Sequence, residues 1–481
     1  MRPRVCFITP PSLFLMDERV FIALGILKVA AVAEQLGYPV EHLDLNGVEN
    51  YLDVVSDYVS HTSARIFALT ATTPQMPAVE RIAVRIRSLR PTAKLILGGP
   101  HPTLLYAALR SGRRASYAWL RLRRAFNTIV AGDGEDAIQA AIETTGLINA
   151  DDPKGSYFLS SSRLADLPLP ARHLVDLGSY HYTIDNVPVT GLISQLGCPF
   201  GCHFCAGRDS AMLRRVRLRP TEHVLQELRH LVEQYNMRGF MFFDDELNVN
   251  RQLISLLQGM DDLQWRLGVD FRCRGFVKAE LFTAEQAEWM YRVGFRRILC
   301  GFESGSPRIL KNINKHATLE DNTRAMEIAY KYGLEMKALM SIGHPGESFE
   351  TIQDTILWLL RVRPADFDAT IITTYPGSPY YDRATPHTVP GVWKFETNGD
   401  RLYSYDVDYA DVEDYYKGTP GEYKSYVYTD YLSAEDLVAL REYAERMVRE
   451  KLQIPYYSSR AAVLYEHSMG QLPPFIWRAS A

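Results

Sequence analysis

The chain has 481 residues, with 53 Lys and Arg against 57 Asp and Glu, so its formal charge is −4. Its composition, 47% hydrophobic and 23% charged, excludes a fibrous repeat and a wholly disordered chain. Because this length exceeds one hydrophobic core, we expect roughly two or three domains, and the near-neutral charge gives no reason to expect nucleic acid as a partner. The apolar runs are too short to span a bilayer, and Pro10-Pro11 interrupts any signal-peptide core, which predicts a soluble, cytoplasmic protein.

Residues 1–145 alternate short apolar runs with helical patterns, which is typical of a parallel α/β sheet. Strands are predicted at Val5–Thr9, Val40–Leu45, Ile66–Thr70, Lys94–Leu97 and Thr128–Ala131. Ligands of such sheets bind beyond the carboxyl ends of the strands, where glycine lets a ligand approach the backbone closely. The candidate binding residues there are Pro10, Thr72, Thr73, Gly98, Gly99, Pro100, His101, Gly132, Gly134 and Glu135. Taken singly, each of these glycine-rich loops is better explained as a tight turn.

The first strand ends in Pro-Pro and not in a G-x-G-x-x-G turn, which disfavours NAD. The Ala-Leu-Gly-Ile-Leu segment 23–27, Gly-Gly-Pro-His-Pro-Thr at 98–103 and Gly-Asp-Gly-Glu at 132–135 instead resemble the cobalamin-binding domain that precedes the catalytic barrel in cobalamin-dependent radical S-adenosylmethionine (SAM) enzymes. The resemblance implies that the candidate residues named above bind cobalamin. None of the 12 His residues has an Asp two positions before it, so the D-x-H-x-x-G motif of mutase-type domains is absent. The resemblance then implies base-off cobalamin without a protein His on cobalt, with His101 at the rim of the corrin.

Two further segments of this half have no motif of their own. Six arginines lie between Arg110 and Arg124. They could bind phosphate or an acidic partner, but a solvated basic helix is the better interpretation. Residues 146–189 lack periodicity and contain Leu-Pro-Leu-Pro-Ala-Arg at 167–172, which predicts an extended linker strap. Similar straps join the two domains in the family that the chain resembles.

The strongest motif in the chain is a group of three cysteines. Six cysteines are too few for a disulfide framework, but Cys198, Cys202 and Cys205 are spaced C-x3-C-x2-C within a predicted loop. The other cysteines, Cys6, Cys273 and Cys300, are interpreted as buried thiols. Thiolates select zinc or iron–sulfur, and structural zinc takes four ligands, yet no fourth cysteine follows before Cys273. Three thiolates on a four-iron cluster leave one iron open, so a [4Fe-4S] cluster is favoured.

With Phe204 directly before the last cysteine, this spacing resembles the signature of the radical SAM superfamily. The resemblance implies that the open iron chelates the methionine moiety of SAM. It also implies that one electron, from a donor such as flavodoxin or ferredoxin, cleaves SAM to a 5′-deoxyadenosyl radical.

Residues 190–384 repeat strand and helix six times, which predicts a partial (β/α)6 barrel of the TIM type. Its strands are predicted at Leu192–Leu196, Phe240–Phe243, Leu267–Phe271, Arg297–Cys300, Met336–Ile342 and Thr370–Thr374. Carboxylates at the strand ends suit the amino group and ribose of SAM, and an arginine suits its carboxylate. By resemblance, the SAM-binding residues are Phe204, Asp244, Asp245, Glu246, Arg274, Glu303, Ser304, Gly343, Pro345 and Tyr375. For Glu246 and Arg274, an ordinary strand-end ion pair is an equally good interpretation.

The rest of the chain, residues 385–481, is predicted to be a mostly helical or irregular extension. Residues 400–431 contain nine tyrosines, and a helix is predicted from Ser433 to Leu452. The tyrosine-rich segment either lines a substrate pocket or packs on the surface. The predicted fold is therefore α/β: a Rossmann-like cobalamin-binding domain (1–145), a linker strap (146–189), the barrel (190–384) and this extension.

Together these motifs resemble cobalamin-dependent radical SAM enzymes of the class B methyltransferase type. The resemblance implies three cofactors, a [4Fe-4S] cluster, SAM and cobalamin, and methylation of an unactivated carbon of a small-molecule substrate through a 5′-deoxyadenosyl radical and methylcobalamin. Two alternatives stay open: a radical cyclisation, rearrangement or oxidation without methyl transfer, and a non-catalytic cobalamin- or metal-binding protein. A tRNA methylthiotransferase is disfavoured, because the first domain lacks a three-cysteine set and the sequence shows no appended RNA-binding β-barrel.

Overall fold

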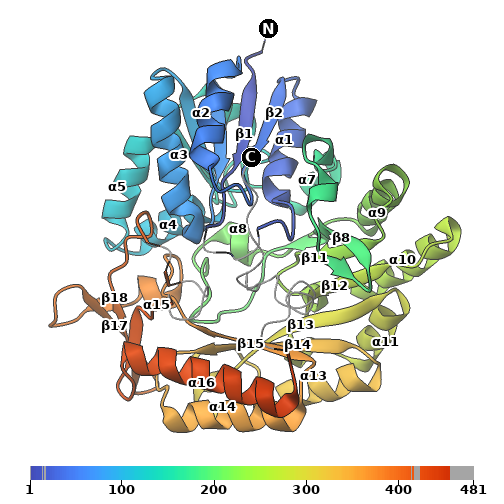
Figure 1. Ribbon diagram of the computed structural model, residues 1–481, viewed down its shortest axis with the longest axis vertical. Helices are drawn as coiled ribbons and strands as arrows, with labels where there is room; N and C mark the ends of the chain where they lie inside the picture. The colour runs from blue at the N-terminus through green and yellow to red at the C-terminus, as the bar shows by residue number, and fades with distance from the viewer. Residues whose placement is uncertain (1, 14, 16–17, 413, 416–422, 456–481) are drawn as a thin grey trace.

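The computed structural model describes residues 2–13, 15, 18–412, 414–415 and 423–455. A parallel sheet from the N-terminal part of the chain lies above a curved half-barrel, and the later part of the chain adds a small antiparallel sheet and a long helix (Figure 1). In the described part of the chain, no helix combines the length and the apolar character that a membrane crossing requires.

The first sheet is parallel and has the strand order β2-β1-β3-β4-β5-β6. Its strands are β1 (Val5–Thr9), β2 (Val40–Asp44), β3 (Ile66–Thr70), β4 (Lys94–Gly98), β5 (Thr128–Gly132) and β6 (Gly146–Ala150). Its helices are α1 (Leu24–Gln35), α2 (Tyr51–His61), α3 (Met76–Leu89), α4 (Pro100–Ser111), α5 (Ser116–Ala125) and α6 (Ile138–Glu143). Successive side chains of a strand point to opposite faces, so these apolar strands present two faces that must be covered. Helices α1 and α6 pack on one face, and α2 to α5 pack on the other. The five predicted strands are confirmed, and β6 adds a sixth strand from the segment predicted as linker.

The half-barrel is a second sheet with the strand order β15-β14-β13-β12-β11-β8-β7. Its strands are β7 (Thr183–Ile184), β8 (Val187–Leu192), β11 (Gly239–Phe242), β12 (Arg272–Phe276), β13 (Phe295–Glu303), β14 (Glu335–Ile342) and β15 (Asp366–Ile371). All but β7 are parallel, which confirms the six-unit barrel. The strap before it carries α7 (Ser161–Asp166), and the short strands β9 (Gln195–Leu196) and β10 (Arg217–Leu218) flank α8 (Ala211–Arg214).

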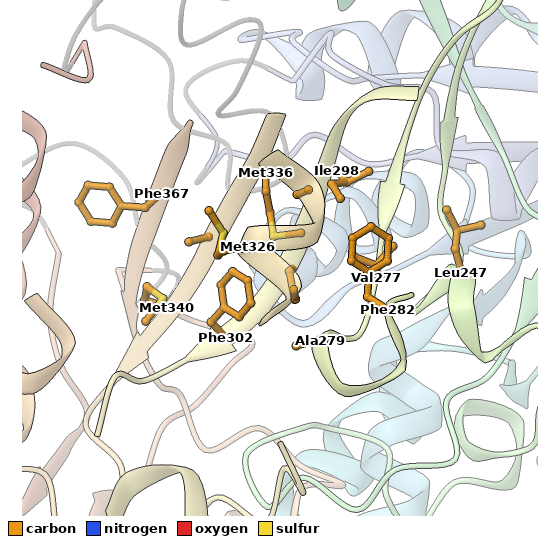
Figure 2. Close-up of a cluster of buried hydrophobic side chains, with 14 of the residues drawn as sticks. Leu247, Val277, Ala279, Phe282, Ile298, Phe302, Met326, Met336, Met340 and Phe367 are labelled. Atoms are coloured by element: carbon orange, nitrogen blue, oxygen red, sulfur yellow. The ribbon is translucent and has the colours of Figure 1, made fainter. Parts of the chain in front are cut away.

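The outer face of the half-barrel is its main hydrophobic core. The covering helices are α9 (Thr221–Tyr235), α10 (Leu253–Leu267), α11 (Ala284–Arg292), α12 (Pro307–Asn312), α13 (Leu319–Lys331) and α14 (Phe349–Val362). Figure 2 shows side chains of this core, among them Ile298, Met336 and Phe367. Cys273 and Cys300 are fully buried in this core, as interpreted from the sequence. The inner face holds a smaller apolar cluster, to which Val20 from the β1–α1 connection contributes.

After the short helix α15 (Pro379–Asp382), the extension forms a four-stranded antiparallel sheet that the sequence analysis missed. Its strands are β16 (Thr385–Pro386), β17 (Val392–Thr397), β18 (Asp400–Tyr405) and β19 (Val427–Thr429). The predicted helix is confirmed as α16 (Ala434–Leu452), with Ser433 as its N-cap. Arg441 and Arg449 of α16 donate to main-chain carbonyls of β15, so this helix covers the open edge of the half-barrel (Figure 1).

Three predicted barrel strands were misplaced. The first is β8 and ends at Leu192, because the main-chain amides of Ser194 and Gln195 donate to Asp244 instead of to a strand. The third was predicted at Leu267–Phe271, but α10 runs to Leu267 and Gly268 ends it with φ 64°. The last is Asp366–Ile371 rather than Thr370–Thr374, because Lys337 pairs with Asp366 and makes a charged residue acceptable in a buried strand.

The interpretation of 110–124 as a solvated basic helix was wrong for three of its arginines. Arg114 stacks on Tyr381 and Trp393, with its guanidinium carbon 4.1 and 4.6 Å from the ring centroids. Arg121 pairs with Asp408 and Asp411. Arg110 pairs with Asp151 and donates to the main chain of residue 209. The basic and the acidic, tyrosine-rich segments therefore hold the first domain against the barrel and the extension.

Candidate active site at the facing edges of the two sheets

A cavity of about 230 Å³ opens at the carboxyl edge of the first sheet. Most of its wall is apolar and comes from strands β1, β3, β4 and β5 and from helix α1. Of the candidate cobalamin residues, it is lined by Gly98, Gly99, Pro100, Gly132, Gly134 and Glu135. Ile193, Leu196 and Met212, from the segments on either side of the cysteine loop, complete the wall. The cavity is therefore shared between the first domain and the cysteine-bearing segment.

The glycines of this cavity are required by close approach of the backbone. Gly99 has φ 96°, and a Cβ atom there would lie 2.5 Å from Oγ1 of Thr70. A Cβ atom on Gly134 would lie 2.8 Å from Val29. At Gly98, by contrast, the nearest atom to an added Cβ is 4.0 Å away, so this glycine leaves open space at the cavity wall. The mainly apolar lining and the open space at Gly98 suit the apolar part of a ligand that approaches the main chain there.

The remaining candidate cobalamin residues lie around the start of α3 and α4. His101 is buried, its Nδ1 lies 3.1 Å from Oγ1 of Thr73, and burial lowers its pKa to about 4. It is therefore neutral at physiological pH. The main-chain amide and the hydroxyl of Thr72 donate to Oε1 of Gln75, and the side-chain amide of Gln75 donates to the carbonyl of Pro10. These residues hold the loops that border the cavity.

Two ion pairs set the charge around the cavity. Lys28 pairs with Glu135 at 2.5 Å; the glutamate is buried and the lysine partly buried. Asp133 pairs with Arg217, which follows the cysteine loop in β10. Burial raises the pKa of Asp133 to about 6, although Arg217 opposes the shift. The second pair fixes the glycine-rich 132–135 loop to the barrel domain.

The cysteine loop lies at the end of β9, on the other side of the shared cavity. Gly197 begins it with φ 84°, and a Cβ atom there would lie 2.1 Å from the carbonyl oxygen of Arg215. The amide of Cys198 donates to Leu213, and the amide of Cys205 to Cys202. His203 turns toward the end of α12, where its Nδ1 lies 3.0 Å from the carbonyl oxygen of Asn312. The loop is therefore held in place by main-chain hydrogen bonds.

The three thiols interact electrostatically and share one nearby cation. Burial raises the pKa of Cys205 to about 12, and the charges of Cys202 and Cys198 add to the shift. Arg208 is buried and donates to the carbonyls of Cys198 and Phe200. Its guanidinium lowers the pKa of all three thiols. Arg208 therefore stabilises thiolates in this loop, and the sequence analysis did not identify it.

Within the described residues, no three His, Cys, Asp or Glu side chains surround a single metal ion. The donor set of the loop is three thiols, one fewer than a closed structural zinc site takes. Three thiolates suit a four-iron cluster with one iron left open.

The three consecutive acids after β11 have different surroundings. Asp244 is fully buried and accepts from the amides of Ser194 and Gln195, at 2.9 and 2.7 Å. It therefore ties β11 to the start of the cysteine loop. Asp245 lies near that loop, where partial desolvation of its carboxyl raises its pKa and the charge of Arg208 opposes the shift. Burial raises the pKa of Glu246 to about 7, and its Oε2 atom is a buried acceptor without a hydrogen-bond partner.

A hydrogen-bonded chain crosses the barrel from β13 to α15. Lys315 pairs with Oε1 of Glu303 at 3.0 Å, and Ser341 donates to Oε2 at 2.7 Å. Since the Ser341 hydroxyl has a single proton, it accepts from Nε2 of His344, at 2.7 Å. Nδ1 of His344 then accepts from the hydroxyl of Tyr380, at 3.1 Å. Burial lowers the pKa of His344 to about 4, which agrees with this neutral tautomer.

Two buried lysines add positive charge beside the cysteines. Burial lowers the pKa of Lys315, but the charges of Glu303 and Cys202 outweigh burial and leave the pKa above its usual value. Lys278 pairs with Glu280 at 2.6 Å, and its ammonium lies 4.1 Å from the ring centroid of Phe200. Neither lysine was predicted, because each is isolated in the sequence and only the fold brings it to the cysteines.

The other predicted SAM-binding residues make contacts within the protein. Phe204 packs edge-on against His344, with the ring centroids 5.5 Å apart, and Tyr375 packs on Tyr409 and Tyr415 of the extension. The hydroxyl of Ser304 bonds to Thr355 and to the amide of Ser306.

The amide of Gly343 donates to Glu347, and the carbonyl of Pro345 accepts from Asn312, so both lie in a structured loop. Arg274 lies in the middle of β12 and not at a strand end. It is buried against the ring of Tyr182, to whose hydroxyl it donates. The strand-end position on which its predicted role depended was therefore wrong.

Comparison with known families identifies both halves of this site. Residues 18–142 match the B12 binding domain, and residues 192–359 match the Radical SAM superfamily. The first match covers the glycine cradle, and the second covers the cysteine loop, the three acids and the hydrogen-bonded chain from Glu303 as far as His344. The two domains imply cobalamin, SAM and a [4Fe-4S] cluster.

Relatives with similar sequences include both methyltransferases and cyclases. An uncharacterized methyltransferase of Pyrococcus horikoshii is 25% identical over 66% of this chain and 69% of its own length. An anaerobic magnesium-protoporphyrin IX monomethyl ester cyclase of Cereibacter sphaeroides is 23% identical over 69% of this chain, and the aligned region is 56% of that cyclase.

Among solved structures, the radical SAM methyltransferase TsrM of Kitasatospora setae superimposes with a TM-score of 0.65 at 16% identity, over 94% of this chain and 100% of its own. The cobalamin-dependent radical SAM enzyme OxsB superimposes with a TM-score of 0.59 at 16% identity, over 76% of this chain and 53% of its own. At this identity the two structures show a common fold.

Proposed function

We propose that this chain, which combines a B12-binding domain with a radical SAM domain and belongs to the cobalamin-dependent radical SAM enzymes, methylates an unactivated carbon of a small-molecule substrate. When bound, the [4Fe-4S] cluster, SAM and cobalamin supply the electron, the hydrogen-abstracting radical and the methyl group. The chain's own task is to hold these groups against one substrate carbon and to exclude water.

The observation that carries this proposal is the shared wall of the cavity. Ile193 and Met212, from either side of the cysteine loop, line a cavity whose other walls belong to the B12-binding domain. Arg217 fixes the two edges together through Asp133. A cofactor in the cradle and a cofactor at the cysteines therefore act on the same space, as a transfer between them requires.

For the cluster, we propose Cys198, Cys202 and Cys205 as ligands, with Arg208 stabilising their thiolate form. For SAM, we propose that Asp245 and Glu246 accept from its amino group and Glu303 from its ribose. The unpartnered Oε2 atom of Glu246 supports this assignment, because a buried acceptor is costly unless a ligand donates to it. Phe204 and the loop at Gly343 and Pro345 are proposed to border the adenine, with Tyr375 nearby. Asp244 and Ser304 are left out of this set, because each holds a main-chain amide of a neighbouring loop. Arg274 is left out because it lies in the middle of β12 against Tyr182.

For cobalamin, we propose the base-off form without a protein ligand to cobalt. His101 supports this, because it is buried among the loops with its Nδ1 at hydrogen-bond distance from Thr73. Replacing His101 by Ala should leave the absorption spectrum of the cobalamin-loaded protein unchanged. Loss of a cobalt–nitrogen signature in that variant would contradict the assignment.

The reaction is tested by mass spectrometry of anaerobic turnovers with SAM, cobalamin and candidate substrates. Methylation yields a product 14 mass units heavier, with S-adenosylhomocysteine and 5′-deoxyadenosine formed together. Formation of 5′-deoxyadenosine alone would exclude methyl transfer.

That outcome would favour the second candidate, a radical cyclase, which is raised by the similarity to the magnesium-protoporphyrin ester cyclase. A protein that takes up zinc and no iron would instead support a non-catalytic binding role.

A further inference from the structure

We propose that the tip of the β17–β18 hairpin, residues 398–400, is a positioning element of the SAM site. In this role Asp400 acts through Asn312 and holds the loop of residues 343–347 at a fixed distance from the cysteine loop. The inference rests on the proposed function, which takes the 343–347 loop as the border of the adenine. The hairpin itself lies outside both family matches, which end at residues 142 and 359.

The shape of the hairpin tip follows from its sequence. Asn398 and Gly399 have φ of 51° and 84°, the positive values that a two-residue Asn-Gly turn requires at both positions. Thr397 and Asp400 are therefore paired directly across the two strands. On either side of Gly399, Asn398 and Asp400 both reach the side chain of Asn312 at the end of α12.

Asn312 is buried, and its side-chain amide is fully hydrogen-bonded. Its Nδ2 donates to Oδ2 of Asp400 at 2.7 Å and to the carbonyl of Pro345 at 2.8 Å, and its Oδ1 accepts from Nδ2 of Asn398 at 3.0 Å. A flipped amide would put Oδ1 against the carboxylate and the carbonyl, which cannot donate. The hairpin tip therefore sets the orientation in which Asn312 holds the 343–347 loop.

Asp400 is itself held by α12. Arg308, one turn before Asn312, donates to both oxygens of the Asp400 carboxylate. The hydrogen bond and the charge of this guanidinium lower the pKa of Asp400. Such a bidentate pair fixes the direction of the carboxylate as well as its charge, so Asp400 presents a fixed acceptor to Asn312.

The extension also contacts the 343–347 loop directly. Gly346 has φ 84°, and a Cβ atom there would lie 2.5 Å from Oδ2 of Asp400, so the main chain of the loop rests on this carboxylate. Oγ1 of Thr429, in β19, donates to the carbonyl of Glu347 at 2.8 Å. The carbonyls of Pro345 and Glu347 are therefore both held from outside the loop, by groups that belong to the extension or depend on it.

The end of α12 holds the cysteine loop as well. The main-chain amide of His203 donates to the carbonyl of Ile313, and Nδ2 of Asn314 donates to the carbonyl of Gly201, both at 2.9 Å. The end of α12 thus contacts both loops between which SAM is proposed to lie. A ligand that spans from the open iron to the 343–347 loop depends on their spacing, whereas a ligand that reaches only the iron does not.

The test compares SAM with methionine, which carries the same amino and carboxyl groups but no adenosine. Binding of each to the reduced, cluster-loaded protein is followed by the change in the electron paramagnetic resonance spectrum of the cluster. Asp400→Ala removes the carboxylate, and Asn398→Gly removes one amide and tolerates the positive φ. Arg401→Met is the matched control, because this exposed neighbour in β18 pairs with Asp430 at the surface.

Asp400→Ala should weaken SAM binding on the order of tenfold and Asn398→Gly about threefold, as expected for the loss of a charged and of a neutral hydrogen bond. Methionine affinity should stay within about twofold of wild type in both variants, and Arg401→Met should change neither affinity. A variant that only destabilises the fold lowers the melting temperature without changing the ratio of the two affinities. The ratio therefore separates positioning from stability.

Unchanged SAM affinity in either variant would overturn the proposal, as would an equal loss of SAM and methionine affinity. Asn398→Gly alone decides the matter should Asp400→Ala take up no iron. Failure of the proposed function has a different signature, because SAM would then leave the spectrum of the wild-type cluster unchanged or yield no methylated product from the wild-type protein.

Discussion

The two facing edges of this protein are built by different means. The edge of the first sheet is mainly backbone and apolar surface: Gly98 leaves room at the cavity wall, Gly99 and Gly134 pack closely against Thr70 and Val29, and its lysine, Lys28, is paired with Glu135. The edge of the half-barrel is built of side chains that carry charge. Three thiols there are surrounded by buried Arg208, Lys278 and Lys315 and by the acids that follow the strands.

This difference indicates how each edge can fail. A cavity lined mainly by backbone offers few side chains to truncate, so the substitution that weakens ligand binding there is one that adds a bulky side chain. In a charged site, the damaging substitution is one that removes a charge, because the partner of the lost group is then left buried without compensation. Four substitutions test this distinction, in order of decreasing expected effect.

Cys202→Ala should abolish cluster assembly, because two thiolates remain where three hold the iron. Reconstituted wild-type protein should contain about four irons per chain, and the variant close to none. Cys300→Ala is the control, since this thiol is fully buried in the outer core. Iron analysis and the yield of 5′-deoxyadenosine measure the effect. A Cys202→Ala protein with its full iron content would contradict the ligand assignment.

Gly98→Leu should weaken cobalamin binding by on the order of tenfold or more, because overpacking a filled site costs about 1–3 kcal/mol. The nearest atom to an added Cβ is 4.0 Å away, so the fold accepts the new side chain and the cavity receives it. Titration of cobalamin measures the loss, and the iron content should stay at the wild-type value. Gly112→Ala, with open space around its Cβ, is the control. Unchanged cobalamin affinity would place the cofactor elsewhere.

Glu246→Gln should weaken SAM binding about fivefold, which corresponds to ~1 kcal/mol for a hydrogen bond that loses its charge. Equilibrium binding to the cluster-loaded protein measures the effect, and Asp262→Asn on the exposed face of α10 is the control. Equal affinities in wild type and Glu246→Gln would remove Glu246 from the SAM site.

Glu246 should also make SAM affinity and protein stability depend on pH. Burial raises the pKa of Glu246 to about 7, so the carboxylate accumulates as the pH rises through 7, and SAM affinity should rise with it. The stability of the ligand-free protein should change in the opposite direction. The folded state binds the Glu246 proton more tightly than the unfolded state, so this group's stabilising contribution is lost as the pH rises from its ordinary pKa to about 7. Glu246→Gln should flatten both profiles.

Arg114→Met should leave both cofactor sites loaded and lower the free energy of unfolding by about 1–3 kcal/mol, through the loss of two cation–π contacts and a hydrogen bond to Ser404. Thermal unfolding measures the change, with Arg124→Met on the exposed face of α5 as control. A large loss of cobalamin or iron in Arg114→Met would show that the extension also shapes the site.

Much of the fold could be predicted because local patterns are consistent with it. The strands of the first sheet are continuous apolar runs between glycines, and the helix capped by Ser433 has its signal in sequence. Strands with buried charges were harder to predict. Asp366 and Arg272 break the apolar pattern of β15 and β12, and the partners that make them acceptable, Lys337 and Asp185, lie far away in the chain.

The cysteine spacing by itself indicated an iron–sulfur cluster, because thiolate ligation needs particular residues at short, fixed separations. The glycine-rich loops indicated cobalamin through their resemblance to a known domain. Only the tertiary structure decided which charged side chains join them. In the folded protein Asp244 holds main-chain amides and Arg274 is buried inside a strand. Lys278 and Lys315 lie near Cys202, and His344 packs against Phe204. A charge in a buried site is acceptable only beside its partners, and those partners come from strands that are distant in sequence.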